Sequence, residues 1–285
     1  MPPKSTYLKP HLTIEQQIQK LKTKNIEIDN LNKAKHSLSH LNYYRLSAYW
    51  KAYPYKIKFQ KILNDYFFDK ELRLLILSAI ESIEISLKTQ ISFILTSKYG
   101  IHPNLKSILD EKYDIQKFKE EYNRNNEEFI KHFKEKYKEP LPPMWIMVEI
   151  ISFGQLSMMY KCIKERKDRN AISHKYGLDS SILQLYIHQL TIIRNISAHH
   201  GRLWNKKFTL NLKIPKAGKI ANSSEKRGYK NKKIYNSLVF LKYMLDIIEP
   251  LHSWDIKLKE LIRKYDINID FMGFPLKWDL LPVWR

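Results

Sequence analysis

The stretch SSILQLYIHQLTIIRNISAHHG, residues 180–201, joins a helical pattern to a group of polar side chains at its end. Ser180 and Ser181 offer an N-cap, and Gly201 offers a stop. Between them, apolar residues recur at steps of three and four: Ile182, Leu185, Tyr186, Leu190, Ile193 and Ile196. This spacing predicts an amphipathic helix that runs into residues 194–199.

Several polar side chains at the end of this helix fall on one face. With Arg194 as the origin and about 100° per residue, Asn195 and His199 lie at roughly 100° and roughly 140°. Arg202 follows at roughly 80°, whereas His200 falls at roughly 240°, on another side. We therefore expect Arg194, Asn195, His199 and Arg202 to converge, and His200 to support the packing around them.

These side chains suit RNA cleavage without a metal, in which the 2′-hydroxyl attacks the adjacent phosphate. The reaction needs a proton acceptor, a proton donor and a cation. Histidine can take either proton role near neutral pH, and the fork of arginine matches phosphate oxygens. Each chain has one imidazole on this face, His199, so we expect a homodimer that doubles the face. The alternative is structural, because the helix dipole also favours Arg and His at a helix C-terminus.

The string RNISAHHGRLWN, residues 194–205, resembles the signature of the Abi-like proteins of the AbiD/AbiF lineage, which are bacterial abortive-infection factors of the HEPN superfamily. The HEPN hallmark is an arginine, a polar residue and, four to six positions later, a histidine; Arg194, Asn195 and His199 match it. Further stretches resemble the lineage in the same order: NYYRLSAYW (42–50), residues 71–100, PMW to SFG (143–154) and MGFP (272–275).

This resemblance covers nearly the whole chain and implies an all-α helical bundle of HEPN type. It also implies a phage-defence toxin that cleaves RNA. Two other functions stay open: a non-catalytic module that holds a structured RNA, such as a cognate small RNA that silences the toxin, or the HEPN partner of a nucleotidyltransferase. Only the ribonuclease needs His199 as an acid or base.

The composition favours a helical protein with a polyanionic partner. Lys and Arg number 50 against 29 Asp and Glu, a net charge of +21, which favours nucleic acid, although genome bias also enriches lysine. Only 7 glycines argue against an all-β or Rossmann-type fold. The single cysteine, Cys162, forbids an internal disulfide and suits the bacterial cytoplasm. The N-terminus lacks an apolar signal core and charges interrupt the apolar runs, so we expect no membrane span. We also expect no cofactor.

The chain is expected to divide into an N-terminal helical segment, residues 1–65, and a HEPN-like domain, residues 66–285. The domain should contain a charged insert (101–141) and a basic loop (206–233). Thr13 and Gln16 predict a capping box for the first helix, and Asp29 a cap for the second. The expected helices elsewhere cover about 29–50, 70–99, 144–164, 235–251 and 255–265, followed by a tail that packs Phe271, Phe274, Trp278 and Trp284.

Other candidate site residues carry alternatives of their own. Glu81 and Glu84 can pair with the motif arginines or lie on a solvated face. Two carboxylates also suggest a metal site, but only weakly, because no metal-ligand spacing accompanies them. Arg45 lies among aromatic residues that can stack RNA bases, although a core role is commoner. The basic loop predicts an RNA clamp or a solvated charge run. Its cations are Lys206, Lys207, Lys213, Lys216, Lys219, Lys226, Arg227, Lys230, Lys232 and Lys233.

Overall fold

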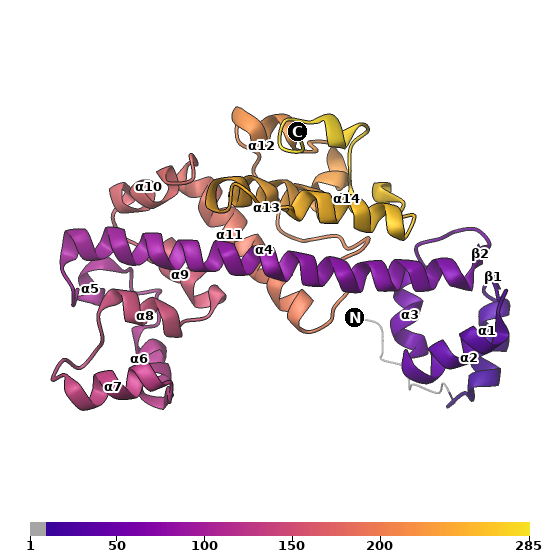
Figure 1. The fold of residues 1–285 in the computed structure, drawn as a ribbon, viewed down its shortest axis with the longest axis horizontal. Coiled ribbons are helices and arrows are strands. Elements are labelled where there is room, and N and C mark those ends of the chain that lie inside the picture. The colour runs from indigo at the N-terminus through magenta and orange to yellow at the C-terminus, as the bar shows by residue number, and fades with distance from the viewer. Residues whose placement is uncertain (1–9) are drawn as a thin grey trace, which may run out of the picture. The chain divides into compact units, whose positions relative to one another are not determined.

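The computed structural model describes residues 10–285, which form 14 α-helices, three 3₁₀ helices and two strands of two residues each (Figure 1). The expected all-α class is confirmed. Residues 1–9 lie outside the described residues. The expectation that the N-terminus lacks an apolar signal core concerns these residues. Within residues 10–285, every helix is too short or too polar to cross a membrane. The chain divides into two compact units, Met1–Glu71 with Glu260–Ile267, and Leu72–Lys259 with Asn268–Arg285.

The first unit contains short helices and one parallel strand pair. Its elements are α1 (Ile14–Lys22), β1 (Ile26–Glu27), α2 (Leu31–His40), α3 (Tyr43–Trp50) and β2 (Ile57–Lys58). Ile26 pairs with Ile57 in the parallel ladder. The capping box of Thr13 with Gln16 is confirmed.

The expected single helix over residues 29–50 is wrong, because Asn42 starts a new one. Its side chain accepts a hydrogen bond from the Tyr44 N–H at 2.7 Å, which caps α3 and ends the continuity with α2. Asn30, rather than Asp29, caps α2 through the Lys33 N–H. The apolar spacing continues through residue 42, but the side-chain cap of Asn42 starts a second helix there.

The longest helix, α4 (Phe59–Tyr99), has 41 residues and starts about ten residues before the expected position. In the first unit it contributes two fully buried carboxylates, Asp65 and Asp69. Tyr53 donates to Asp65 at 2.6 Å and Tyr49 to Asp69 at 2.8 Å, so buried acids are satisfied by tyrosines that precede α4.

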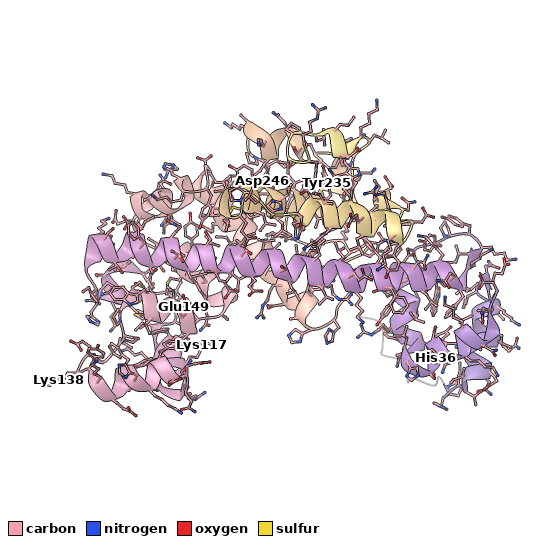
Figure 2. All side chains as sticks on the ribbon, viewed as in Figure 1. His36, Lys117, Lys138, Glu149, Tyr235 and Asp246 are labelled. Carbon is pink, nitrogen blue, oxygen red and sulfur yellow. The ribbon has the colours of Figure 1, made fainter. Side chains whose placement is uncertain are left out.

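The second unit contains the rest of α4 and the elements that follow it. They are α5 (Leu105–Ile108), α6 (Ile115–Arg124), α7 (Glu128–Lys136), α8 (Met144–Ile150), α9 (Phe153–Cys162), α10 (Arg166–His174), α11 (Ser180–Ala198), α12 (Gly218–Ser223), η1 (Gly228–Lys232), α13 (Tyr235–Ile248), the part of α14 (Trp254–Lys264) up to Lys259, η2 (Ile269–Met272) and η3 (Trp278–Leu280). The charged insert folds as α5 to α7, and its Lys117 and Lys138 are exposed (Figure 2).

The helix expected over residues 144–164 is also wrong as a single element. Ser152 and Gln155 form a capping box that starts α9 after α8 has ended. Helix α9 packs against α11, where a Cβ on Gly154 would lie 3.5 Å from the Thr191 Cγ2. The group opposite Gly154 is therefore a side chain of α11 rather than another backbone.

Polar contacts attach α4 to its neighbours within the second unit. Lys98 and Tyr99 both donate to Asp168 of α10, each at 2.6 Å. The Trp254 indole donates to the Leu75 carbonyl at 2.9 Å. These contacts hold α4 against α10 at its C-terminal end and against the start of α14 near Leu75.

The aromatic tail packs as expected around Tyr235 of α13. Phe274, Trp278 and Trp284 are buried, and the Trp284 indole donates to the Tyr235 hydroxyl at 3.1 Å. Phe271 packs instead on Trp204, with ring centroids 5.2 Å apart. The tail thus reaches the segment directly behind the motif helix.

Candidate active site

The motif helix, α11, ends in a Schellman turn. His200 adopts a left-handed conformation (φ 57°), its N–H bonds the Ser197 carbonyl at 3.1 Å, and the Gly201 N–H bonds the Ile196 carbonyl at 2.7 Å. His199 is the C-cap residue. The helix begins after Asp179, so Ser180 is its first residue rather than its N-cap. His200 therefore has a backbone role in the turn that presents His199.

Two features behind the motif hold this turn in place. A Cβ on Gly201 would lie only 2.9 Å from the Ile196 Cγ2, so the turn closes on a residue without a side chain. Arg73 of α4, which is 5% exposed, donates from Nη1 to the Gly201 carbonyl at 3.3 Å. A buried guanidinium thus supports the turn, and the sequence analysis did not identify it.

Arg194 is half-buried and lines a cavity of about 380 Å³ together with Glu81, Glu84 and Lys88 of α4. Glu84 pairs with Lys88 at 3.4 Å. Among residues 10–285, no ion pair joins Arg194 to either glutamate, so the structure does not show the pairing alternative at this arginine. The cavity nevertheless places a guanidinium beside two carboxylates.

Asn195 and His199 are exposed and lie one turn apart on α11. In the described part of the chain, their side chains have no hydrogen-bond partner. Neither lines the cavity that contains Arg194. The structure therefore keeps Asn195 and His199 on one exposed side of the helix, with Arg194 directed toward α4.

A cluster of cations lies directly behind the motif. Burial, and then the positive charges of Arg202 and Lys207, lower the pKa of Lys233 below its ordinary value. The Lys233 amine donates to the Asn205 side chain at 2.5 Å. The Phe208 N–H bonds the Lys232 carbonyl at 2.8 Å, which joins the two ends of the basic loop. Repulsion among like charges makes this cluster a favourable place for an anion.

The cations of the basic loop other than Lys233 fall into three groups. Arg227 pairs with Glu225 at 3.0 Å and Lys230 pairs with Asp270, so carboxylates of the chain already neutralise them. Lys206 and Lys232 are half-buried. The cations that are exposed and have no ion pair among the described residues are Lys207, Lys213, Lys216, Lys219 and Lys226.

Arg45 is exposed on α3 and belongs to the first unit, beside Tyr44, which is 80% exposed. Tyr49 and Trp50 of the same stretch are buried, and Tyr43 packs edge-on against Trp50 at 5.0 Å. The preferred core role is therefore confirmed for Tyr49 and Trp50, but not for Tyr44.

The exposed face of α11 carries a second histidine, His188, that the sequence analysis did not assign. It lies 11 residues before His199, and at about 100° per residue the two point within roughly 20° of each other. This spacing was a signal available in the sequence. No group of three or more His, Cys, Asp or Glu side chains within residues 10–285 can hold a metal ion.

Comparison with known proteins places the chain in a family. The family model described as Abi-like protein matches residues 36–205, more than half of the 285 residues, and the match extends from α2 to the segment behind the motif. Neither the curated proteins nor the solved structures give a match. The family suggests a role in abortive infection, a defence against phage. The chain belongs to the Abi-like protein family.

Proposed function

We propose that this protein is a metal-independent ribonuclease of the AbiD/AbiF lineage, within the HEPN superfamily, that acts as a toxin in the bacterial cytoplasm. The observation that carries the proposal is the pair Asn195 and His199, exposed without internal partners at a tightly held helix end. The cation cluster of Arg202, Lys207 and Lys233 lies directly behind them.

In the proposed reaction, the 2′-oxygen attacks phosphorus while the bond from phosphorus to the 5′-oxygen breaks. A base takes the 2′-hydroxyl proton and an acid gives a proton to the leaving 5′-oxygen, so a 2′,3′-cyclic phosphate and a 5′-hydroxyl result. His199 supplies an imidazole for either proton step. Arg194 stabilises the pentacovalent phosphorus, and Asn195 orients the phosphate by hydrogen bonding.

Because each chain supplies one His199, the proposal includes a homodimer in which two copies of the face share one cleft. The surface of α4 next to Arg194 supports this arrangement. Leu74, Ile85 and Phe93 are 61%, 56% and 66% exposed along that helix, and Ile85 also lines the cavity that contains Arg194. An apolar stripe exposed in this way gains free energy when a second copy covers it.

The cations also favour a second function, which is RNA binding without cleavage. The five exposed cations of the basic loop need no reactive imidazole to hold a structured RNA. A cognate small RNA is the partner that this alternative requires. The two functions differ in what His199 does.

The decisive experiment incubates purified protein with RNA in the presence of EDTA. Wild type should cleave, and His199→Ala should cleave about 10²–10⁴-fold more slowly if His199 is the acid or base. His132→Ala is a matched control, because His132 is an exposed histidine of α7 in the insert.

Each outcome decides between the functions. Cleavage that EDTA abolishes and magnesium restores would refute the metal-independent mechanism. Tight RNA binding by wild type without any cleavage would favour the non-catalytic module. Equal cleavage by wild type and His199→Ala would remove His199 from the chemistry.

A further inference from the structure

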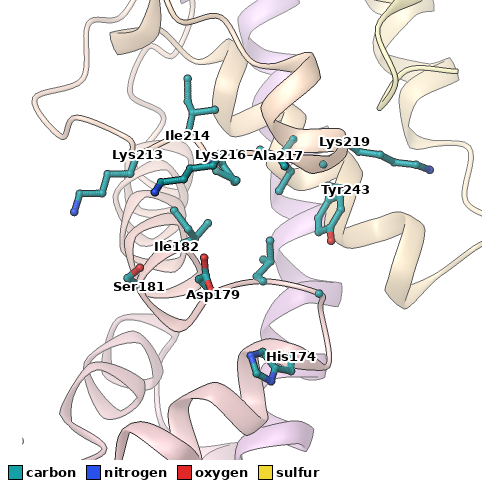
Figure 3. A pocket seen from close by; sticks show the side chains of 15 residues that line it. His174, Asp179, Ser181, Ile182, Lys213, Ile214, Lys216, Ala217, Lys219 and Tyr243 are labelled. Carbon is teal, nitrogen blue, oxygen red and sulfur yellow. The ribbon is translucent and has the colours of Figure 1, made fainter.

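Two cavities on one side of α11 join into a single groove. The first, of about 980 Å³, lies between the turn before α11 and residues 213–220 (Figure 3). The second, of about 570 Å³, lies between α9 and α11. Ser181 and Lys213 line both cavities, so the two cavities adjoin and together are called the groove.

The groove follows the same face of α11 that presents the motif. Its α11 lining includes Ser181, Gln184, His188 and Thr191, at steps of three and four residues. At about 100° per residue, this stripe continues through Asn195 and His199 within a sector of roughly 80°. At a rise of about 1.5 Å per residue, the groove ends at Thr191, roughly 12 Å from His199 along the helix axis.

The charges along the groove favour an anionic ligand. Lys161 of α9 and Lys213 of the basic loop line the second cavity together with His188, and no acidic residue lines it. Lys216 lines the first cavity, where Asp179 is the acidic group. None of these three lysines has a side-chain hydrogen bond or ion pair among residues 10–285. Figure 3 shows Lys213 and Lys216 extending to the same side.

The shape of the groove favours a single strand over a small anion. Ile182 and Ile214 line the first cavity together with its lysines, so bases can lie on apolar side chains while phosphates contact the amines. Gly154 of α9 and Thr191 of α11 both line the second cavity, and a Cβ on Gly154 would lie 3.5 Å from the Thr191 Cγ2, so the glycine leaves room between the two helices. A strand uses the whole length, whereas a small anion needs one end only.

We propose that a single strand of RNA runs along this groove, with phosphates against Lys161, Lys213 and Lys216, and leads to Asn195 and His199. The inference rests on the proposed function in one respect, because the strand arrives at the proposed cleavage face. Binding in the groove itself requires no cleavage. His188 is placed beside the strand rather than at the reacting phosphate.

Binding of a labelled single-stranded RNA at several salt concentrations tests the groove, with the full chain carrying His199→Ala so that RNA stays intact. Replacing Lys161, Lys213 and Lys216 together with alanine should lower the slope of log K against log salt by about 2, at about 0.7 per phosphate contact. The matched control replaces three exposed lysines of the insert: Lys119, Lys131 and Lys138. It removes the same charge and should leave the slope unchanged.

A dinucleotide separates the groove from the motif, because it is too short to occupy both. Relative to wild type, a triple variant that retains His199 should lose a larger factor in binding or cleavage of a long single strand than of a dinucleotide. Equal slope changes in the triple variant and its control, or no change in either, would overturn the groove. If groove variants weaken RNA binding while wild type never cleaves, the ribonuclease proposal fails and the groove stands. Equal circular dichroism spectra confirm that the variants are folded.

Discussion

Replacing Gly201 with alanine tests whether the tight turn behind α11 positions the motif. The new methyl group would lie 2.9 Å from the Ile196 Cγ2 and 3.1 Å from the Ile196 carbonyl oxygen. Ordinary carbon contacts are about 3.5–4.0 Å, so the Schellman turn must open. Forced overpacking of this kind costs about 1–3 kcal/mol. The displaced turn carries His199, so RNA cleavage should fall together with stability.

Gly154→Ala is the matched control, because it adds the same methyl group next to α11 without a clash. Its Cβ would lie 3.5 Å from Thr191, an ordinary contact, and glycine inside a helix is less stable than alanine by about 0.5–1 kcal/mol. Thermal unfolding followed by circular dichroism should show Gly201→Ala melting below wild type and Gly154→Ala at or above it. Each kcal/mol shifts Tm by about 2–4 °C in a unit of this size. A Gly201→Ala protein that melts and cleaves like wild type would refute the role of the turn.

Three further predictions address other parts of the molecule. Arg73→Met should lower the free energy of unfolding by about 0.5–1.5 kcal/mol in urea titrations, because the half-buried Gly201 carbonyl loses its donor; an unchanged midpoint would contradict this. Burial raises the pKa of Asp65 above its ordinary value, so the folded state binds more protons than the unfolded state between those two pKa values. The free energy of unfolding then falls as pH rises through that window. Measured from acidic to neutral pH, it should fall less in Asp65→Asn than in wild type. Identical pH profiles of the two proteins would count against this prediction. Mixed chains of His199→Ala and Arg194→Ala should cleave RNA at a rate that differs from either variant alone, whereas light scattering that shows only monomers, with and without RNA, would refute a shared cleft.

The apolar period predicted the long elements and missed the places where a cap interrupts them. Helix α11 followed from spacing, whereas the all-α class rested on the family resemblance and on the low glycine content. The breaks before α3 and α9 did not follow from spacing, because Asn42 and Ser152 cap new helices at points where the apolar pattern continues. Asparagine and serine are common N-cap residues, so both candidates were visible in the sequence. The sequence did not show whether each side chain would cap a new helix or whether the helix would continue through it.

The candidate site was predictable as far as a straight helix extends. Asn195 and His199 share an exposed side, as the angular argument expected, but Arg194, which was expected to converge with them, lines a cavity with α4 instead. The angles for His200 and Arg202 assumed that the helix continued, whereas the left-handed turn at His200 ends it. Arg73 could not be assigned from spacing, because its contact with Gly201 joins residues far apart in the chain. The sequence hinted at a role for Arg73 only by placing a charged residue between two leucines, Leu72 and Leu74.

The positions that hold the motif and the positions proposed to act are different residues, and this separation decides how variants should be interpreted. Gly201 and Arg73 are held by close contacts and a buried hydrogen bond, so their replacement changes stability and position together. His199 is exposed and has no internal partner among the described residues, so its loss should leave the unfolding free energy nearly unchanged. A loss of cleavage at constant stability therefore indicates chemistry, whereas a parallel loss of both indicates positioning. The same comparison separates Lys213, which has no ion pair within residues 10–285, from Arg227, whose pairing with Glu225 makes its removal a structural change as well as a loss of charge.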